Sequence, residues 1–321
     1  MRNVTLRQLR VLNAVARNGT VTAAAEALAL SPPAVTMQLQ QLRDVAGVPL
    51  VERSRAGMVL TAAGREVLDC ATKIEALLRE CTASLAAMAG AEKGSLHVGV
   101  ISTAKYFAPH ALAAFARAHP GIDLALSVGL RDEIIEGLRH YDLDLAVMGR
   151  APEGLEIEAS EIGEHPHVIV ARHDHPLARR RRLTLADLAG ETFLVRERGS
   201  GTRGLMERSF AAAGVSPKIG MQIGSNETIK QGVLAGLGIT FLSAHTIDAE
   251  VASHRLVVLD VQGLPIIRTW YVMHLRERAL MPAALLLRDF LTSEGRRYLP
   301  RRWHRPGRDA DTALTVAPAV T

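Results

Sequence analysis

The chain has 321 residues, 48% of them hydrophobic and 22% charged, which is typical of a folded protein with two or three domains. No apolar run approaches the ~20 residues that a membrane helix needs, and arginines interrupt the N-terminal segment, which excludes a signal peptide. The two cysteines, Cys70 and Cys81, cannot form a disulfide framework. We therefore expect a cytoplasmic protein with no membrane partner.

Positive charge is concentrated at the start of the chain. The formal net charge is +5, and residues 1–61 contain seven arginines but only three acidic residues. Such an excess favours contact with nucleic acid without proving it. Two further groups of arginines, at 179–182 and 296–308, are interpreted as solvated surface.

Hydrophobic periodicity predicts short helices in the first thirty residues. Apolar residues recur every three positions from Leu6 to Val15, and Asn18-Gly19 ends this first helix. Thr22 is expected to cap a second short helix, in which small alanines allow another helix to approach closely.

A third helix and a hairpin complete the predicted N-terminal domain. Ser31 is a suitable N-cap, Pro32 fits the first helical position, and Gly47 ends the helix. Residues 50–60 have the pattern of a β-hairpin with a glycine-containing turn. Three helices followed by a hairpin are typical of a winged helix-turn-helix, which we assign to residues 1–60.

In this fold the third helix enters the major groove of DNA and the hairpin contacts the DNA backbone. Threonine and glutamine can bond to base edges, whereas proline and methionine offer apolar contacts. The candidate DNA-binding residues are Ser31, Pro32, Pro33, Thr36, Met37, Gln40, Gln41, Arg53 and Arg55. The alternative is a three-helix bundle with no role in DNA binding.

A long helix is predicted for residues 61–92, with Thr61 as its N-cap. Its apolar residues are spaced alternately four and three apart, the heptad pattern of a helix that packs against a partner helix. They are Val67, Ala71, Ile74, Leu78, Cys81, Leu85 and Met88. The alternative is packing against its own domain. Cys70 and Cys81 would lie about 16 Å apart, too far for a disulfide, and both are interpreted as buried thiols.

After residue 93 the pattern changes to alternating strands and helices. Strands are predicted at 96–100, 123–128, 143–148, 168–171, 193–195, 219–223, 239–242, 256–259 and 266–274, and a helix at 281–294. This alternation indicates a doubly wound α/β fold with two units. Ligands in such folds bind at the carboxyl ends of strands and at helix N-termini.

Three strand-to-helix loops, together with a segment at the end of the third strand, combine small residues with cations. Backbone N–H groups in such loops can bind an anion, and Lys105, Arg150 and Arg203 can add positive charge. The candidate ligand-binding residues are Ser102, Thr103, Lys105, Gly149, Arg150, Gly201, Thr202, Arg203, Ser225 and Asn226. The alternative is that the serines and threonines only cap helices.

No catalytic motif is present in the sequence. The glycine-rich segment 199–203 lacks the lysine of a P-loop, and no Gly-x-Ser-x-Gly elbow occurs. The one metal-like cluster consists of His165, His167, His173, Asp174 and His175. No cysteine or glutamate completes a compact ligand set, so we expect no metal site, no cofactor and no enzyme activity.

The first sixty residues contain a series of motifs: Ala-Ala-Glu-Ala-Leu, then Ser-Pro-Pro-Ala-Val at the third helix, then Leu-Thr-x-Ala-Gly after the hairpin. With these motifs the segment resembles the DNA-binding region of LysR-type transcriptional regulators. Met37 and Arg43 stand where this family frequently has arginine and glutamate.

The resemblance extends over the rest of the chain. It implies that the long helix dimerises the protein, that residues 94–164 with 268–300 form one effector subdomain, and that residues 165–267 form the other. The subdomains would be joined by crossings near Glu164 and Arg268, with the effector bound between them. The implied partners are operator DNA with an inverted repeat, further copies of the chain in a dimer of dimers, and RNA polymerase. Residues 301–321 show no periodicity and are predicted to be disordered.

Within this family the chain is most similar to the regulators of Calvin-cycle operons, in the stretches SPPAVTMQLQQL, ISTAKYFAPHALAAFARAHPGI, FLVRERGSGTR and GSNETIKQGVLAGLGI. That similarity implies an activator of carbon dioxide fixation genes. Its effector would be a sugar phosphate, phosphoenolpyruvate, ATP or NADPH. The alternatives are a LysR-type regulator of another pathway and a small-molecule-binding protein with no role on DNA.

Overall fold

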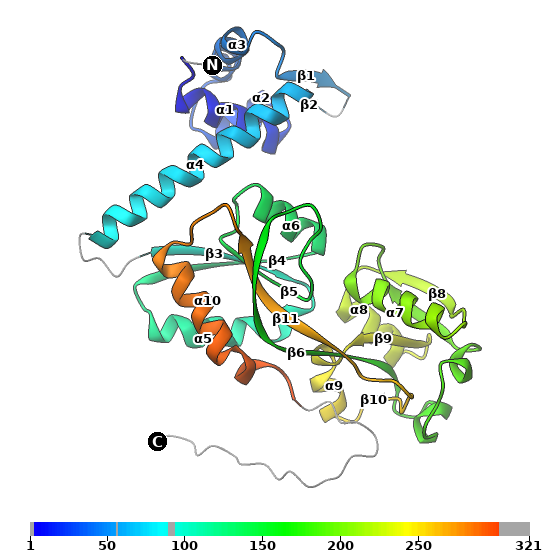
Figure 1. The fold of residues 1–321 in the computed structure, drawn as a ribbon. Helices are drawn as coiled ribbons and strands as arrows, with labels where there is room; N and C mark the ends of the chain where they lie inside the picture. Colours follow the sequence, from blue (N-terminus) through cyan, green and yellow to red (C-terminus); the bar gives the residue numbers. More distant parts are fainter. Residues whose placement is uncertain (1–2, 56, 89–93, 302–321) are drawn as a thin grey trace. The chain divides into compact units, whose positions relative to one another are not determined.

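A computed structural model of the protein describes residues 3–55, 57–88 and 94–301. The chain divides into two compact units, Met1–Lys93 and Gly94–Thr321, which are described separately below (Figure 1). Apart from Arg301, the tail predicted to be disordered lies outside the described residues. Within the described ranges, no helix is both long and apolar enough to cross a membrane.

The first unit has the predicted winged helix-turn-helix elements. Its helices and strands are α1 (Leu6–Asn18), α2 (Val21–Ala27), α3 (Pro32–Ala46), β1 (Val51–Ser54) and β2 (Gly57–Leu60). Ser31 caps α3, with Pro32 in its first turn, and Gly47 ends it in the left-handed conformation, as predicted. The expected cap of α2 is wrong, because Thr20, and not Thr22, accepts the hydrogen bond from Ala23 N.

The hairpin is attached to the turn between α1 and α2. Met58 N donates a hydrogen bond of 2.7 Å to the carbonyl oxygen of Gly19. Gly57 has a φ of +117°, and a Cβ at this position would lie 2.4 Å from the same oxygen. Only glycine combines this backbone conformation with such a close approach, so Gly57 allows the wing to dock on the helices.

The long helix α4 (Ala62–Met88) presents its heptad residues to two different environments. Val67 and Ala71 are buried in the core of the first unit, and Ile74 packs against that core. Farther along, Leu78 is 40% exposed and Leu85 60% exposed. The N-terminal part of the heptad stripe therefore packs within its own chain, while the part beyond Ile74 is uncovered there. The Met88 side chain lies outside the described ones.

The expectation of buried thiols is wrong for the single chain, because Cys70 and Cys81 are both exposed. Cys81 lies on the uncovered part of the heptad stripe, between Leu78 and Leu85. The heptad spacing predicts which residues lie on one stripe of the helix. It does not predict which of them are buried against other parts of the same chain.

The second unit is built on one mixed sheet of nine strands in the order β4-β3-β5-β11-β6-β9-β7-β8, with β10 paired to β6. The strands are β3 (Gly94–Ile101), β4 (Ile122–Gly129), β5 (Leu145–Met148), β6 (Ile157–Arg172), β7 (Thr192–Arg196), β8 (Lys218–Ile223), β9 (Ile239–Ser243), β10 (Leu256–Val258) and β11 (Ile266–Leu275). The predicted α/β class is confirmed.

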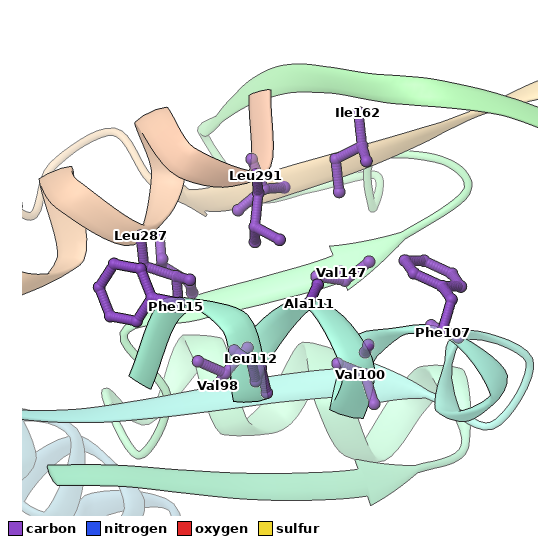
Figure 2. Packing of buried hydrophobic residues seen from close by; sticks show 14 of the residues in the cluster. Val98, Val100, Phe107, Ala111, Leu112, Phe115, Val147, Ile162, Leu287 and Leu291 are labelled. Carbon is purple, nitrogen blue, oxygen red and sulfur yellow. The ribbon is translucent and has the colours of Figure 1, made fainter. Parts of the chain in front are cut away.

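Helices cover both faces of this sheet. They are α5 (Ala108–Ala118), α6 (Arg131–Arg139), α7 (Gly201–Ala212), α8 (Asn226–Leu234), α9 (Asp248–Ala252) and α10 (Pro282–Glu294). Leu145 and Val147 of β5 face the core under α5 and α10, whereas Ala146 and Met148 face the core under α6. Figure 2 shows Phe115 of α5 beside Leu287 of α10. Strands buried on both faces explain why the sequence shows uninterrupted apolar runs.

Strands β6 and β11 join the two halves of the sheet, as Figure 1 shows. They pair antiparallel, with Arg268 opposite His165, and the register shifts at Trp270. The sequence predicted only 168–171 of β6, because residues 157–167 are rich in glutamate and contain a glycine and a proline. The two expected units are therefore parts of one continuous sheet, connected where these strands cross.

Candidate functional site

The third helix presents a polar face beside its buried one. Val35, Leu39 and Leu42 are buried in the core of the first unit. The residues predicted to read DNA are exposed: Ser31, Pro32, Pro33, Thr36, Met37, Gln40 and Gln41. A helix with such an exposed face is suited to insertion into the major groove.

Hydrogen bonds within the unit leave some of these side chains freer than others. Thr36 Oγ1 donates to the carbonyl oxygen of Pro32 at 3.0 Å, and Gln41 Oε1 accepts from Gln8 Nε2 at 3.4 Å. Gln40 has no hydrogen-bond partner among the described residues, and Met37 is 51% exposed. Gln40 and Met37 are therefore the side chains best placed to touch base edges.

The wing, formed by β1 and β2, follows α3 in the sequence and carries positive charge. Arg53 and Arg55 are exposed, at the end of the hairpin. Arg43, at the far end of α3, lies 2.9 Å from Asp44 Oδ1 through its Nη2 atom. Because Asp44 partly neutralises Arg43, the wing arginines are the better candidates for phosphate contacts.

A cavity of about 500 Å³ lies in the second unit, beside the crossing of β6 and β11. It is lined by the ends of β3, β5 and β7 and by the first turn of α7. Of the residues predicted to bind a ligand, Ser102, Thr103, Gly149, Arg150, Gly201, Thr202 and Arg203 line it. These residues come from segments far apart in the sequence, as expected for a site at the carboxyl ends of strands.

The remaining three candidates do not line this cavity. Ser225 caps α8 by accepting a hydrogen bond from Thr228 N, which is the alternative considered for such loops. Asn226 is buried and accepts a hydrogen bond of 2.6 Å from Arg196 Nη1. Lys105 lies over the ring of Tyr106. The loop that contains Ser225 and Asn226 therefore contacts the wall residue Arg196 but does not itself line the cavity.

The N-terminus of α7 opens into the cavity. Its N-cap residue, Ser200, makes no side-chain hydrogen bond to the helix, in contrast to Ser225 at α8. Thr202 is buried, and its hydroxyl has no partner among the described residues. Unpaired N–H groups and the positive end of the helix dipole make this terminus an anion-binding position.

Positive charge dominates the cavity wall. Arginines at 131, 150, 196, 198, 203, 208 and 268 line it, against the glutamates at 197 and 207. Burial lowers the pKa of Arg268 from its usual value, and the neighbouring Arg208 lowers it further. Burial likewise lowers the pKa of Arg131, with a contribution from Arg150. Burial and, to a lesser extent, repulsion between the arginines therefore disfavour the charged side chains, and a bound anion would offset both effects.

The arginines differ in how free they are to meet a ligand. Arg203 is held by Glu207 at 2.7 Å and also donates to the carbonyl oxygen of Arg196. Arg150 pairs with Glu153 at 2.8 Å. Among the described residues, Arg268 donates only to the carbonyl oxygen of Gly149, at 2.9 Å, and no described carboxylate neutralises its charge. Arg203, which the sequence predicted to bind the ligand, is therefore better placed to hold the end of β7 against α7 than to contact a ligand.

Within the described residues, two hydrogen bonds beside the cavity link the segment after β3 to the other half of the second unit. Arg196 Nη2 donates to Ser102 Oγ at 3.1 Å. Tyr106 Oη donates to Glu227 Oε1 at 2.5 Å, and Glu227 also pairs with the buried Lys230. These contacts tie the loop after β3 to α8 and β7, so the relative position of the two halves depends on side chains next to the cavity.

Sequence reasoning missed the arginines at 131, 196, 198, 208 and 268, and it interpreted two wall histidines, His165 and His167, only as possible metal ligands. Burial, together with the charge of Arg268, lowers the pKa of His167 to about 3. Among the described residues, no three His, Cys, Asp or Glu side chains gather as a metal site would need. Arg268 reaches this wall because it pairs across strands with His165. That pairing is known only once the register of the sheet is known.

Two family descriptions match the chain. Residues 6–65 match "Bacterial regulatory helix-turn-helix protein, lysR family", and residues 89–296 match "LysR substrate binding domain". The "HTH-type transcriptional regulator CbbR" of Xanthobacter flavus is 52% identical over 299 residues, which cover 92% of this chain and 90% of the relative. The "RuBisCO operon transcriptional regulator" of Allochromatium vinosum is 46% identical over 295 residues, covering 92% and 98%.

Solved structures agree with these matches. The regulatory domain of Synechocystis PCC6803 CcmR, in complex with 2-PG, is 36% identical with a TM-score of 0.60, covering 62% of this chain and 96% of that one. Full-length CbnR complexed with its target DNA is 26% identical with a TM-score of 0.64, covering 89% and 98%.

Proposed function

Because this chain belongs to the LysR family of bacterial transcriptional regulators, we propose that it controls Calvin-cycle genes in response to a small anionic metabolite. The family is one of DNA-binding regulators with a small-molecule-binding domain, and not one of enzymes. The observation that carries the proposal is the high identity, over both units, to the RuBisCO operon regulators. The arginine-lined cavity supports the choice of an anion as effector.

The proposed assembly is a dimer of dimers in the cytoplasm, bound to an inverted repeat near a promoter and acting on RNA polymerase. The exposed α3 face supports the reading of DNA bases, and the uncovered Leu78, Cys81 and Leu85 support pairing of α4 helices. The effector would be a phosphorylated or carboxylated metabolite of the sugar phosphate, phosphoenolpyruvate, ATP or NADPH class. Its contacts would lie at the α7 N-terminus and the neighbouring arginines.

The experiment on DNA compares Gln40→Ala with Arg53→Ala in the full chain. Each protein is titrated with a site selected from random DNA by the wild type and with unselected DNA, at several salt concentrations. Gln40→Ala should lose about 1–3 kcal/mol on the selected site only, as expected for a base contact. Arg53→Ala should weaken binding to both DNAs and reduce the salt slope by about one.

The matched control is Gln231→Ala, which removes an exposed glutamine from α8 in the other unit. It should leave both affinities unchanged. Equal losses on selected and unselected DNA for Gln40→Ala would show that α3 does not read the sequence.

The experiment on assembly places a charge on the uncovered part of the heptad stripe. Leu85→Glu should dissociate pairs of α4 helices, because burying an unpaired carboxylate between them costs about 2 kcal/mol or more. Ile74→Glu is unsuitable, since Ile74 also packs against the core of its own chain. Thr82→Glu, an exposed position of the same helix off the stripe, is the control.

Light scattering of the full-length proteins gives the mass of each assembly. A wild-type mass for Leu85→Glu would rule out this stripe as the contact between subunits.

A further inference from the structure

Two histidines of β6, His165 and His167, line the cavity beside the arginines. His165 is 3% exposed and His167 is 0% exposed. Their ring centroids lie 4.2 Å apart, and the ring of His165 stacks on Trp270 at 3.8 Å. Both rings are therefore held rigidly in the cavity wall.

The hydrogen bond of His167 determines which of its nitrogens carries the proton. Nδ1 lies 3.1 Å from the carbonyl oxygen of His165, and a carbonyl oxygen can only accept. Nδ1 is therefore the donor, and Nε2 of the neutral ring is a bare acceptor. This Nε2 atom is buried and has no hydrogen-bond partner among the described residues.

His165 adds a second unpaired ring to the same wall. Neither of its nitrogens has a partner among the described residues, so it presents one donor and one acceptor. Burial, with the neighbouring His167, His245 and Arg268, lowers the pKa of His165 well below its usual range. Both rings stay neutral at physiological pH and keep their acceptor atoms.

A buried acceptor without a partner is unfavourable, so a bound molecule gains affinity by bringing a hydrogen-bond donor to it. Carboxylates and phosphate dianions only accept. An amine would add positive charge to a wall where arginines already outnumber glutamates. A hydroxyl group is a neutral donor that fits these restrictions and is common in phosphorylated metabolites.

We propose that His165 and His167 select an effector that carries a hydroxyl group together with its anionic group. The cavity would take a hydroxylated phosphate ester in preference to a hydroxyl-free one. The inference rests on the proposed anion site. The anionic group would lie at the α7 N-terminus and Arg268, and the hydroxyl at the histidine wall.

The test uses the full chain and two matched pairs of probes in calorimetry. One pair is 3-phosphoglycerate and 3-(phosphonooxy)propanoate, which lacks only the hydroxyl. The other is ribulose 1,5-bisphosphate and 2-oxopentane-1,5-diyl bisphosphate, which keeps the ketone and lacks the two hydroxyls. In at least one pair the hydroxylated probe should bind about tenfold or more tightly than its partner, the worth of one hydrogen bond to a buried group.

Variants then assign the preference to residues. His167→Phe should lower the affinity for the hydroxylated probe to that of its partner and leave the partner's affinity unchanged. His110→Phe, which alters an exposed histidine of α5, should keep the wild-type preference. Binding to DNA checks that each variant is folded, and the comparison on the wild type does not depend on any variant.

Three results would contradict the inference in different ways. Equal binding of both members of each pair by the wild type would overturn hydroxyl selection and leave the anion site standing. A preference that survives in His167→Phe would overturn the assignment to His167. Binding of no probe by a protein that still binds DNA would overturn the anion site, and with it this inference.

Discussion

Replacing Arg268 with alanine should lower the affinity of the cavity for a phosphorylated effector by about tenfold to a hundredfold, since hydrogen bonds to charged groups contribute about 1.5–3 kcal/mol. Arg268 is half-buried in the wall, and within the described part of the chain its only hydrogen bond is to the carbonyl oxygen of Gly149. A partly desolvated guanidinium that no carboxylate neutralises attracts an anion more strongly than the exposed, paired Arg150.

The measurement is a thermal shift of the full chain with ribulose 1,5-bisphosphate and 3-phosphoglycerate, followed by calorimetry. A ligand that binds only the folded protein raises its unfolding midpoint, and the rise should shrink in Arg268→Ala. Arg181→Ala removes the same charge from an exposed position outside the cavity and should behave like the wild type. If both variants lose affinity equally, net charge and not the position of Arg268 controls binding.

Replacing Gly64 with alanine should destabilise the first unit by about 1–3 kcal/mol, the usual cost of overpacking. Gly64 lies in the first turn of α4, where an added Cβ would be 1.9 Å from the carbonyl oxygen of Leu50. That oxygen already accepts a hydrogen bond from Thr61 N. Because the clash is with backbone, the start of the wing or the start of α4 must move, and DNA binding should fall with it.

Thermal unfolding and DNA binding of the full chain measure this effect. A loss of 1 kcal/mol corresponds to a shift of about 4–8 °C for a unit of 60–100 residues. Gly190→Ala is the control, since its Cβ would meet no atom within 4 Å and its backbone is not left-handed. An unchanged transition in Gly64→Ala would mean that the wing can shift at no cost.

Local signals in the sequence were sufficient for the first unit. The capping residue Ser31, the proline after it and Gly47 act within a few residues of the helix ends that they define, so the bounds of α3 follow from them. The cap of α2 shows the limit of such signals, because Thr20 and Thr22 are equally suitable and the left-handed turn at Gly19 decides between them.

Strand positions in the second unit followed from apolar runs, because strands covered on both faces bury successive residues in different cores. In β7, Phe193 and Val195 face one core and Leu194 the other. The first half of β6 lacked this signal, since it is polar and is stabilised by its pairing with β11. Pairing between strands about a hundred residues apart cannot be predicted from the local sequence of either strand.

The sequence by itself determined the family, the winged helix-turn-helix, the α/β class and the loops that line one side of the cavity, because motifs, caps and apolar runs are local properties. Only the tertiary structure decided which cations meet in the cavity, that Arg268 lies opposite His165, and that the heptad stripe is covered by its own chain up to Ile74. These facts depend on sheet register and helix packing, which sum many weak contacts between distant segments, and no short stretch of sequence encodes that sum.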